Sequence, residues 1–171
     1  YSKEIAGFEC RNIPSTKEEI LSNNLYMPDT QTALKAEEYL KKCIENHDSA
    51  GGIVECIIKN VPAGIGETVF DKLDASLSKA IFSLGAVKGF EVGTGFKASR
   101  LNGSENNDPF IAENGKVTKL TNNAGGILGG MSDGSDIVFR AAFKPTPSIF
   151  KPQKTVDVNL NNTQIEIKGR H

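Results

Sequence analysis

A glycine-rich stretch between residues 93 and 135 constrains the fold of this chain more than any other feature. It carries few apolar runs, and it is too long to be an idle connection within a compact domain. Its densest part is the run Asn-Asn-Ala-Gly-Gly-Ile-Leu-Gly-Gly-Met-Ser-Asp-Gly at 122–134. Consecutive glycines allow close backbone approach to a ligand and let several N–H groups point at one anion. They are equally typical of a tight structural turn, and the run lacks the Lys-Ser/Thr ending of a Walker A loop, so both interpretations stay open.

The segments on either side of this stretch show helical and strand patterns. Apolar residues at steps of three and four predict helices over 32–46 and 69–83, the second with Phe70 on its apolar face and Gly85 at its C-cap. Because helices and strands come in mixed order with hairpin signals, the chain is expected to be α+β with a largely antiparallel sheet. Strands are expected at 3–13 (an edge strand), 53–61, 87–92, 137–143, 154–158 and 164–168, the last two forming a hairpin.

Composition excludes several classes of protein. With 171 residues the chain fits one domain, and 20 Lys+Arg against 21 Asp+Glu give a net charge of −1, which excludes a wholesale basic surface for nucleic acid. No stretch approaches the roughly 20 apolar residues of a membrane span, and the first residues lack the pattern of a signal peptide. Cys10, Cys43 and Cys56 lie far apart. They are expected to be reduced thiols of a cytoplasmic protein, with no disulfide framework and no metal site.

The run Lys144-Pro-Thr-Pro-Ser148 is a sharper candidate for a binding segment. Two prolines fix φ and remove N–H donors, so the turn is stiff and presents Lys, Thr and Ser in a set geometry. A cation with two hydroxyls suits a phosphate or the edge of a flavin ring. A rigid exit from the preceding strand is the alternative interpretation.

Three further polar segments are weaker candidates. Gly103–Asp108 offers amide and carboxylate groups, but loops of this composition usually face water. His47, at the end of the first predicted helix, is most simply a surface residue that compensates the helix dipole. At the end of the chain, Arg170 offers a fork for phosphate and His171 a proton carrier, although a charged terminal tetrapeptide is normally disordered.

Taken together and in order, seven segments resemble chorismate synthase. They cover essentially all of residues 48–171, whereas residues 1–47 fit the family only loosely. The segments are Asn60-Val-Pro-Ala-Gly-Ile-Gly-Glu67, Val69-Phe-Asp-Lys-Leu-Asp74, Ala86-Val-Lys-Gly-Phe-Glu-Val-Gly93, Gly103-Ser-Glu-Asn-Asn-Asp108, Asn123-Ala-Gly-Gly-Ile-Leu-Gly-Gly130, Phe143-Lys-Pro-Thr-Pro-Ser-Ile149 and Lys168-Gly-Arg-His171.

The resemblance implies an enzyme of the shikimate pathway. Members of the family convert 5-enolpyruvylshikimate 3-phosphate to chorismate and phosphate by a 1,4-elimination, and they require reduced FMN although no net redox change occurs. The implied fold is a layered β-α-β sandwich with helices between antiparallel sheets, and the implied assembly is a homotetramer, with no membrane or nucleic-acid partner. The flavin is reduced either with NADPH or by an outside reductase, and the sequence does not choose between these.

The resemblance also assigns residues to the flavin. Gly85, Ala86 and Gly129 are expected to offer backbone to it, and Arg170 to contribute charge near the flavin and the substrate phosphate. Lys144 is also expected to stabilise negative charge on the flavin. The expected flavin contacts are therefore Gly85, Ala86, Gly129, Lys144, Pro145, Thr146, Pro147, Ser148 and Arg170.

The chain also departs from the family pattern. Asn123 stands where the family usually has His, and Gly85 where many members have Asn. The family's Gly-Glu-Ser-His-Gly, Arg-Pro-Gly-His and Gly-Gly-Gly-Arg-Ser-Ser blocks do not occur. We therefore expect residues 1–171 to be one central-to-C-terminal segment of the family's domain, without catalytic residues of its own and inactive by itself. The alternative is a non-catalytic folding or oligomerisation domain with residual flavin or phosphate binding.

Overall fold

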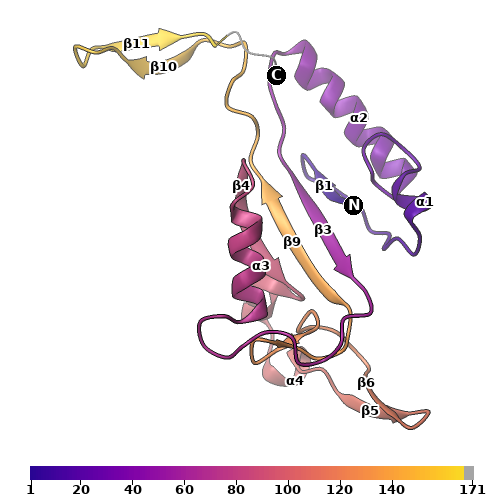
Figure 1. Cartoon of the computed structure of the whole chain (residues 1–171). Helices are drawn as coiled ribbons and strands as arrows, with labels where there is room; N and C mark the ends of the chain where they lie inside the picture. The colour runs from indigo at the N-terminus through magenta and orange to yellow at the C-terminus, as the bar shows by residue number, and fades with distance from the viewer. Residues whose placement is uncertain (168–171) are drawn as a thin grey trace. The chain divides into compact units, whose positions relative to one another are not determined.

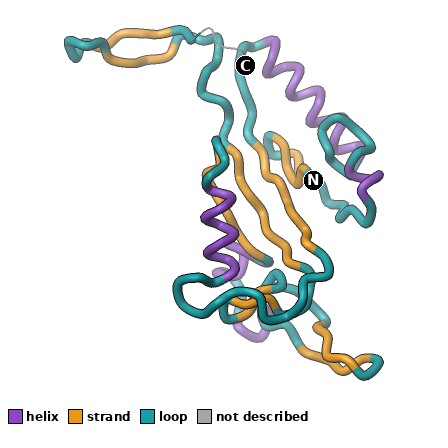
Figure 2. The backbone as a smooth tube through the Cα atoms, viewed as in Figure 1, coloured by secondary structure: helices purple, strands orange, loops and turns teal. Residues whose placement is uncertain are grey.

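The structure, a computed structural model, describes residues 1–167 (Figure 1). The described residues separate into two compact units: one contains Tyr1–Ile53 together with residues 143–167, and the other contains Val54–Ala142. Two strands, β3 (Gly52–Ile58) and β9 (Ile137–Phe143), each contain a boundary between the units. Figure 2 shows that loops and turns make up a large part of the backbone.

The first unit begins with a hairpin. Strands β1 (Ser2–Ile5) and β2 (Phe8–Glu9) pair antiparallel, with Ile5 opposite Phe8. The turn between them consists of Ala6 and Gly7, whose φ angles are 52° and 86°. Positive φ at both central residues is characteristic of the type I′ turn, one of the two favoured two-residue hairpin turns. The expected single edge strand over 3–13 is therefore wrong, because the chain reverses at this turn.

A long helix, α2 (Thr30–Glu45), covers the core of the first unit. The Asp29 side chain caps it by accepting a hydrogen bond from the amide of Thr32 at 3.1 Å. Its buried face carries Ala33, Ala36 and Cys43, at helical spacing. Its main part confirms the helix predicted over 32–46, and the cap explains its earlier start. The remaining elements of this unit are α1 (Lys17–Ile20), β10 (Gln153–Val156) and β11 (Asn162–Ile165).

The second unit is built on strands in the order β3-β9-β4, where β4 spans Val87–Val92. Figure 1 shows β3 and β9 running in opposite directions. One face of these strands packs against helix α3 (Leu73–Phe82), around a core of Ile127, Ile137 and Phe139. The smaller elements of this unit are η1 (Gly95–Arg100), α4 (Gly103–Asn106), β5 (Phe110–Glu113), β6 (Lys116–Lys119), β7 (Ile127–Leu128) and β8 (Met131–Ser132).

Helix α3 is shorter than predicted at both ends. Val69 has a φ of 72° and Phe70 is 87% exposed, so the chain enters the helix only at Leu73. The C-cap is Ser83, and the left-handed residue in the turn that follows is Ala86, with a φ of 69°. The predictions of Phe70 on the apolar face and Gly85 at the C-cap are therefore wrong.

The fold class and the presence of a C-terminal hairpin are confirmed, but the two strands end earlier than the predicted 154–158 and 164–168, and residue 168 lies outside the described residues. Strands β10 and β11 pair antiparallel, with Gln153 opposite Ile165, and the turn between them lies at 157–161. The α+β class with mostly antiparallel sheet is confirmed. Within the described residues, none of the helices combines the length and the apolar character of a membrane span.

Candidate functional site: a glycine-rich loop and a proline-rich segment

The glycine-rich run contains a two-residue hairpin turn. Gly129 and Gly130 connect β7 to β8 with φ angles of 59° and 90°, so both need the left-handed conformation that glycine adopts without strain. The carbonyl of Gly130 accepts a hydrogen bond from the amide of Leu73 at 2.8 Å, which ties the turn to the start of α3. A side chain added at Gly129 would meet no atom within 4 Å. The backbone of Gly129 is thus open to approach.

The amides at the start of this run already have acceptors within the protein. The Asp108 carboxylate accepts from the amides of Asn123 at 2.7 Å and Ala124 at 2.9 Å. The amides of Gly125 and Gly126 donate to the backbone carbonyl and the side-chain oxygen of Asn122, at 3.1 and 2.8 Å. The N–H groups of Asn123 and Ala124 therefore face the protein's own carboxylate, and those of Gly125 and Gly126 face neutral oxygens of Asn122. For 123–126 the structure supports the tight structural turn over an anion site.

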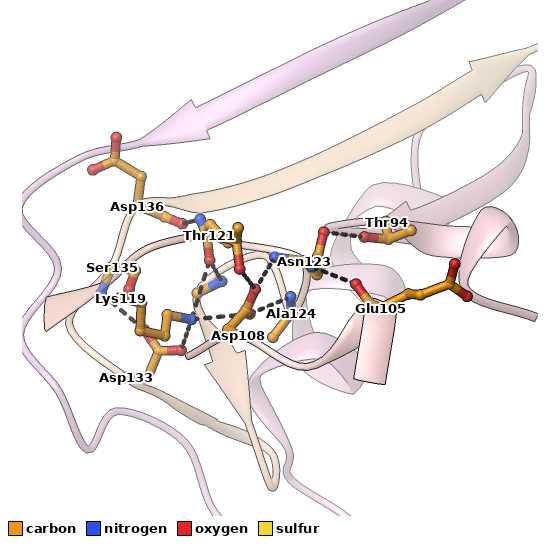
Figure 3. Close-up of polar contacts among 12 residues, drawn as sticks. Thr94, Glu105, Asp108, Lys119, Thr121, Asn123, Ala124, Asp133, Ser135 and Asp136 are labelled. Carbon is orange, nitrogen blue, oxygen red and sulfur yellow. Dashed lines mark hydrogen bonds and ion pairs between the residues drawn. The ribbon is translucent and has the colours of Figure 1, made fainter. Parts of the chain in front are cut away.

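Asp108 belongs to a buried ionic cluster, drawn in Figure 3. The Lys119 ammonium lies 2.6 Å from an Asp133 oxygen and 3.4 Å from an Asp108 oxygen, and it donates to the Asn122 side chain at 3.3 Å. The side chains of Lys119, Asp108 and Asp133 are only 3%, 4% and 8% exposed. All three N–H donors of Lys119 have an acceptor, so this cation is not free to hold a phosphate.

Two opposing effects act on the carboxyl groups of the cluster. Burial raises the pKa of Asp108, but hydrogen bonds from the Thr121 hydroxyl and from the amides of Ala124 and Asn123 outweigh burial and lower it. Burial likewise raises the pKa of Asp133, which the Lys119 hydrogen bond and the amide of Ser135 lower on balance. Both carboxyl groups are therefore ionised, and the cluster provides fixed charges to which the loop amides are bonded.

Asn123 stands where the family usually has His, and its side chain adds a further bond next to this cluster. Its side-chain oxygen accepts from the Thr94 hydroxyl at 3.1 Å, and its backbone carbonyl accepts from the amide of Thr94 at 2.8 Å. Gly93, beside Thr94, packs so closely that an added Cβ would lie 2.1 Å from the Asn123 carbonyl oxygen. The amide side chain therefore bonds to a neighbouring turn in this chain.

The proline-rich segment lies in the first unit, next to the loop that follows α2. The Ser49 hydroxyl donates to the backbone carbonyl of Thr146 at 2.7 Å. Thr146 and Ser148 are half-buried, whereas Lys144 is exposed. Thr146 and Ser148, together with that loop, border a pocket of about 200 Å³. Its lining residues are Ile44, His47, Asp48, Ser49, Thr146, Ser148, Ile149 and Phe150.

The predicted flavin residues fall into separate groups. Gly85, Ala86 and Gly129 are all exposed, and all three lie in turns of the second unit. The run from Lys144 to Ser148 lies in the first unit. Arg170 lies outside the described residues. The predicted flavin residues therefore lie in both units: the run is in the first unit, and the three turn residues are in the second.

The donor set of these residues fits contact with parts of a flavin. Nothing lies within 4 Å of a Cβ built at Gly85 or Gly129, so a planar ring system has room to approach their backbone. Thr146 and Ser148 supply hydroxyls beside a pocket, and Lys144 supplies an exposed cation for a phosphate or a polar ring edge. A pocket of about 200 Å³ is smaller than the roughly 300 Å³ at which small-molecule sites begin, so it is too small to enclose a whole flavin.

Sequence reasoning missed the ionic cluster. Gly103–Asp108 was expected to face water, but residues 103–106 form α4 and the Asp108 side chain is buried. Lys119 and Asp133 carry no local signal, because Lys119 lies 11 and 14 positions along the chain from its two acidic partners. The three cysteines are unpaired, and among residues 1–167 no cluster of three or more His, Cys, Asp or Glu is arranged to hold a metal ion.

Comparison with known proteins gives one consistent family. The family model for chorismate synthase matches residues 3–171. The chorismate synthase of Lachnoclostridium phytofermentans is 58% identical over 172 residues, which are 100% of this chain and 47% of that protein. The chorismate synthase of Methanosarcina barkeri is 58% identical over 163 residues, 92% of this chain and 45% of that protein.

A solved structure agrees with these sequence matches. A crystal structure of chorismate synthase superimposes with a TM-score of 0.79 at 29% identity, over 85% of this chain and 48% of that one. The chain thus spans about half the length of the curated relatives it matches.

Proposed function

Because the chain belongs to the chorismate synthase family, we propose that the protein containing it converts 5-enolpyruvylshikimate 3-phosphate to chorismate and phosphate. The observation that carries this proposal is the family match along residues 3–171, which includes all seven resembling segments. We further propose that residues 1–171 form one segment of the family's domain, acting within a cytoplasmic homotetramer. Since the chain spans about half of its relatives, the segment by itself is proposed to be inactive.

The proposed reaction is a 1,4-elimination by a carbon–oxygen lyase. The C–O bond to phosphate breaks, phosphate leaves with the electron pair, and a ring proton is lost, so a second ring double bond forms without net oxidation. The proposed cofactor is reduced FMN, which supplies electron density while phosphate leaves. NADPH and an outside reductase are the two alternatives for its reduction.

The residues of this chain have binding and electrostatic roles in the proposal. Lys144 is exposed and forms no ion pair with a carboxylate within residues 1–167, so its charge is available to a phosphate or to negative charge that develops during reaction. Thr146 and Ser148 orient polar edges through their hydroxyls, and Gly85, Ala86 and Gly129 offer backbone. Arg170, which lies outside the described residues, is proposed to add charge near the substrate phosphate.

The decisive experiment is an anaerobic assay of the full-length protein. Purified enzyme is mixed with reduced FMN and 5-enolpyruvylshikimate 3-phosphate, and release of phosphate is followed together with chorismate absorbance. We expect both products in equal amounts, and no release when the flavin is oxidised. Absence of both products with flavin bound would remove the proposed activity.

Two variants and one truncation assign the roles. Lys144→Ala is expected to weaken FMN binding, whereas Lys116→Ala, an exposed lysine on β6, leaves it unchanged. Unchanged flavin affinity in Lys144→Ala would remove Lys144 from the site. The chain of residues 1–171 alone is expected to show weak or no flavin binding and no phosphate release, and turnover by it would contradict the proposed inactivity.

A further inference from the structure

The proline-rich segment has a fixed internal shape but few bonds of its own. Pro145 and Pro147 fix φ, and the residues before them, Lys144 and Thr146, are restricted to extended conformations. The segment therefore behaves as a short stiff rod. Two prolines without N–H groups also keep it from forming a regular strand. What sets its position is contact with other parts of the first unit.

Those contacts come mainly from the loop between α2 and β3, which runs beside the segment in the opposite direction. An added Cβ at Gly51 would lie 2.6 Å from the Phe143 carbonyl oxygen and 3.1 Å from the Pro145 ring. The Ser49 hydroxyl bonds the Thr146 carbonyl at 2.7 Å. The loop and the segment therefore run antiparallel, and these contacts join them.

The loop that makes these contacts is itself tied to α2. The amide of Asp48 donates to the carbonyl of Cys43 at 2.8 Å, and the amide of Ser49 donates to the Asp48 carboxylate at 2.9 Å. His47 turns the chain out of the helix with a φ of 55°. The backbone at Ser49 is therefore fixed relative to the end of α2. The Ser49 hydroxyl in turn fixes the Thr146 carbonyl relative to that helix end.

A second bond from this loop reaches Lys151, beyond the end of the segment, and is weaker. The Asp48 carboxylate pairs with the Lys151 ammonium at 2.5 Å, but the two side chains are 45% and 41% exposed. Exposed ion pairs are screened by water and salt and contribute little. The Ser49 bond, in contrast, is part-buried and reaches the middle residue of the rod.

We propose that Ser49 is a positioning residue that holds the segment from Lys144 to Ser148 in place for the flavin. This inference rests on the proposed function, which assigns that segment to the cofactor. Ser49 acts through the Thr146 carbonyl and does not itself touch the cofactor in this proposal. A stiff rod fixed at its centre presents the Thr146 and Ser148 hydroxyls in one orientation, and such preorganisation increases affinity.

The test measures FMN binding by fluorescence titration of the full-length protein. Ser49→Ala is expected to raise the flavin dissociation constant about 5- to 10-fold, which corresponds to one hydrogen bond of ordinary strength. The rate at saturating flavin is expected to change less than about twofold, and the apo melting temperature only slightly, since one part-buried bond is lost. Ser49→Thr, which keeps the hydroxyl, is expected to restore the wild-type affinity.

Ser99→Ala is the matched control. Its hydroxyl also donates to a backbone carbonyl, that of Phe96 at 2.8 Å, but it lies in η1 of the other unit and is exposed. No change in flavin affinity is expected for it.

Three outcomes would overturn the inference. If Ser49→Ala binds flavin like the wild type while Lys144→Ala binds it weakly, the positioning role fails and the flavin assignment survives. If neither variant weakens binding, the assignment of Lys144 to Ser148 fails as well. If Ser49→Ala lowers both the flavin affinity and the melting temperature, and Ser49→Thr restores neither, Ser49 has only a structural role.

Discussion

The glycine-rich loop at 122–134 and the proline-rich segment at 144–148 are both irregular, and opposite means hold them in place. The loop has a flexible backbone that a buried ionic cluster fixes from beneath, with Lys119 and both of its carboxylate partners less than a tenth exposed. The segment has a stiff backbone that a few bonds at partly exposed positions hold in place. Of these two segments, the loop has the freer backbone, and it is also the one that more buried polar contacts hold in a single conformation.

The largest loss of stability is expected when the cation of the cluster is removed. Lys119→Met leaves Asp108 and Asp133 buried without their counter-charge, so the free energy of unfolding is expected to fall by about 3–5 kcal/mol. Urea denaturation of the full-length protein measures it. The control is Lys116→Met, an exposed lysine on the same strand, with a change within about 0.5 kcal/mol. Equal effects of the two variants would show that the cluster does not support the loop.

The next largest effect is expected where two backbones touch. Gly93→Ala places a Cβ 2.1 Å from the Asn123 carbonyl oxygen at a φ of 56°. It is expected to cost about 3 kcal/mol, because backbone atoms of the loop must move. Gly115→Ala has a similar φ of 74° with nothing within 4 Å, so only the conformational cost of about 1–2 kcal/mol remains. Hydrogen exchange of the loop amides checks whether Gly93→Ala opens the loop and Gly115→Ala does not.

The carboxyl groups of the cluster also make stability depend on pH. The pKa values of Asp108 and Asp133 are lowered by folding, so the folded state binds fewer protons than the unfolded state near the unfolded pKa. Their contribution is complete above the ordinary value of 3.8 and is lost as the pH falls through the lowered folded-state values. Asp108→Asn is expected to flatten the acid limb of stability against pH. An acid limb of unchanged steepness in Asp108→Asn would contradict the role given to Asp108.

The smallest effect is expected at the surface pair of the first unit. Lys151→Met removes an ion pair whose partners are 41% and 45% exposed, so stability is expected to change by no more than about 0.5 kcal/mol. The difference from the wild type is expected to vanish at about 1 M salt, where the screening length is about 3 Å. A salt-independent loss would show that this pair supports the segment in the way Lys119 supports the loop.

Local patterns were sufficient wherever an element is bounded by strong local signals. Strands β4 and β9 fall at the predicted residues 87–92 and 137–143. The first lies between turns at Ala86 and Gly93, both with positive φ, and the second ends where Lys144 precedes a proline. The start of α3 was misplaced because Val69 and Phe70 continue the helical spacing while the backbone there is a turn.

Features that depend on distant contacts could not be predicted. Asp108 looks like an ordinary loop residue, and only the folded chain brings its carboxylate to the amides of Asn123 and Ala124. The Ser49 bond joins residues 97 positions apart. Glycines mark where a backbone is free, but the sequence does not say which acceptor its N–H groups will find. The flavin contacts, including Gly129 and Lys144, stay predictions.

The carboxylate of Asp108 has a consequence for ligand binding in the second unit. Because it already occupies the amides at the start of the loop, the backbone there loses its conformational entropy when the protein folds. A molecule that later approaches the open backbone of Gly129 meets a turn that is already ordered. Association at this turn is therefore expected to lack the large unfavourable entropy and the heat-capacity change of coupled folding and binding.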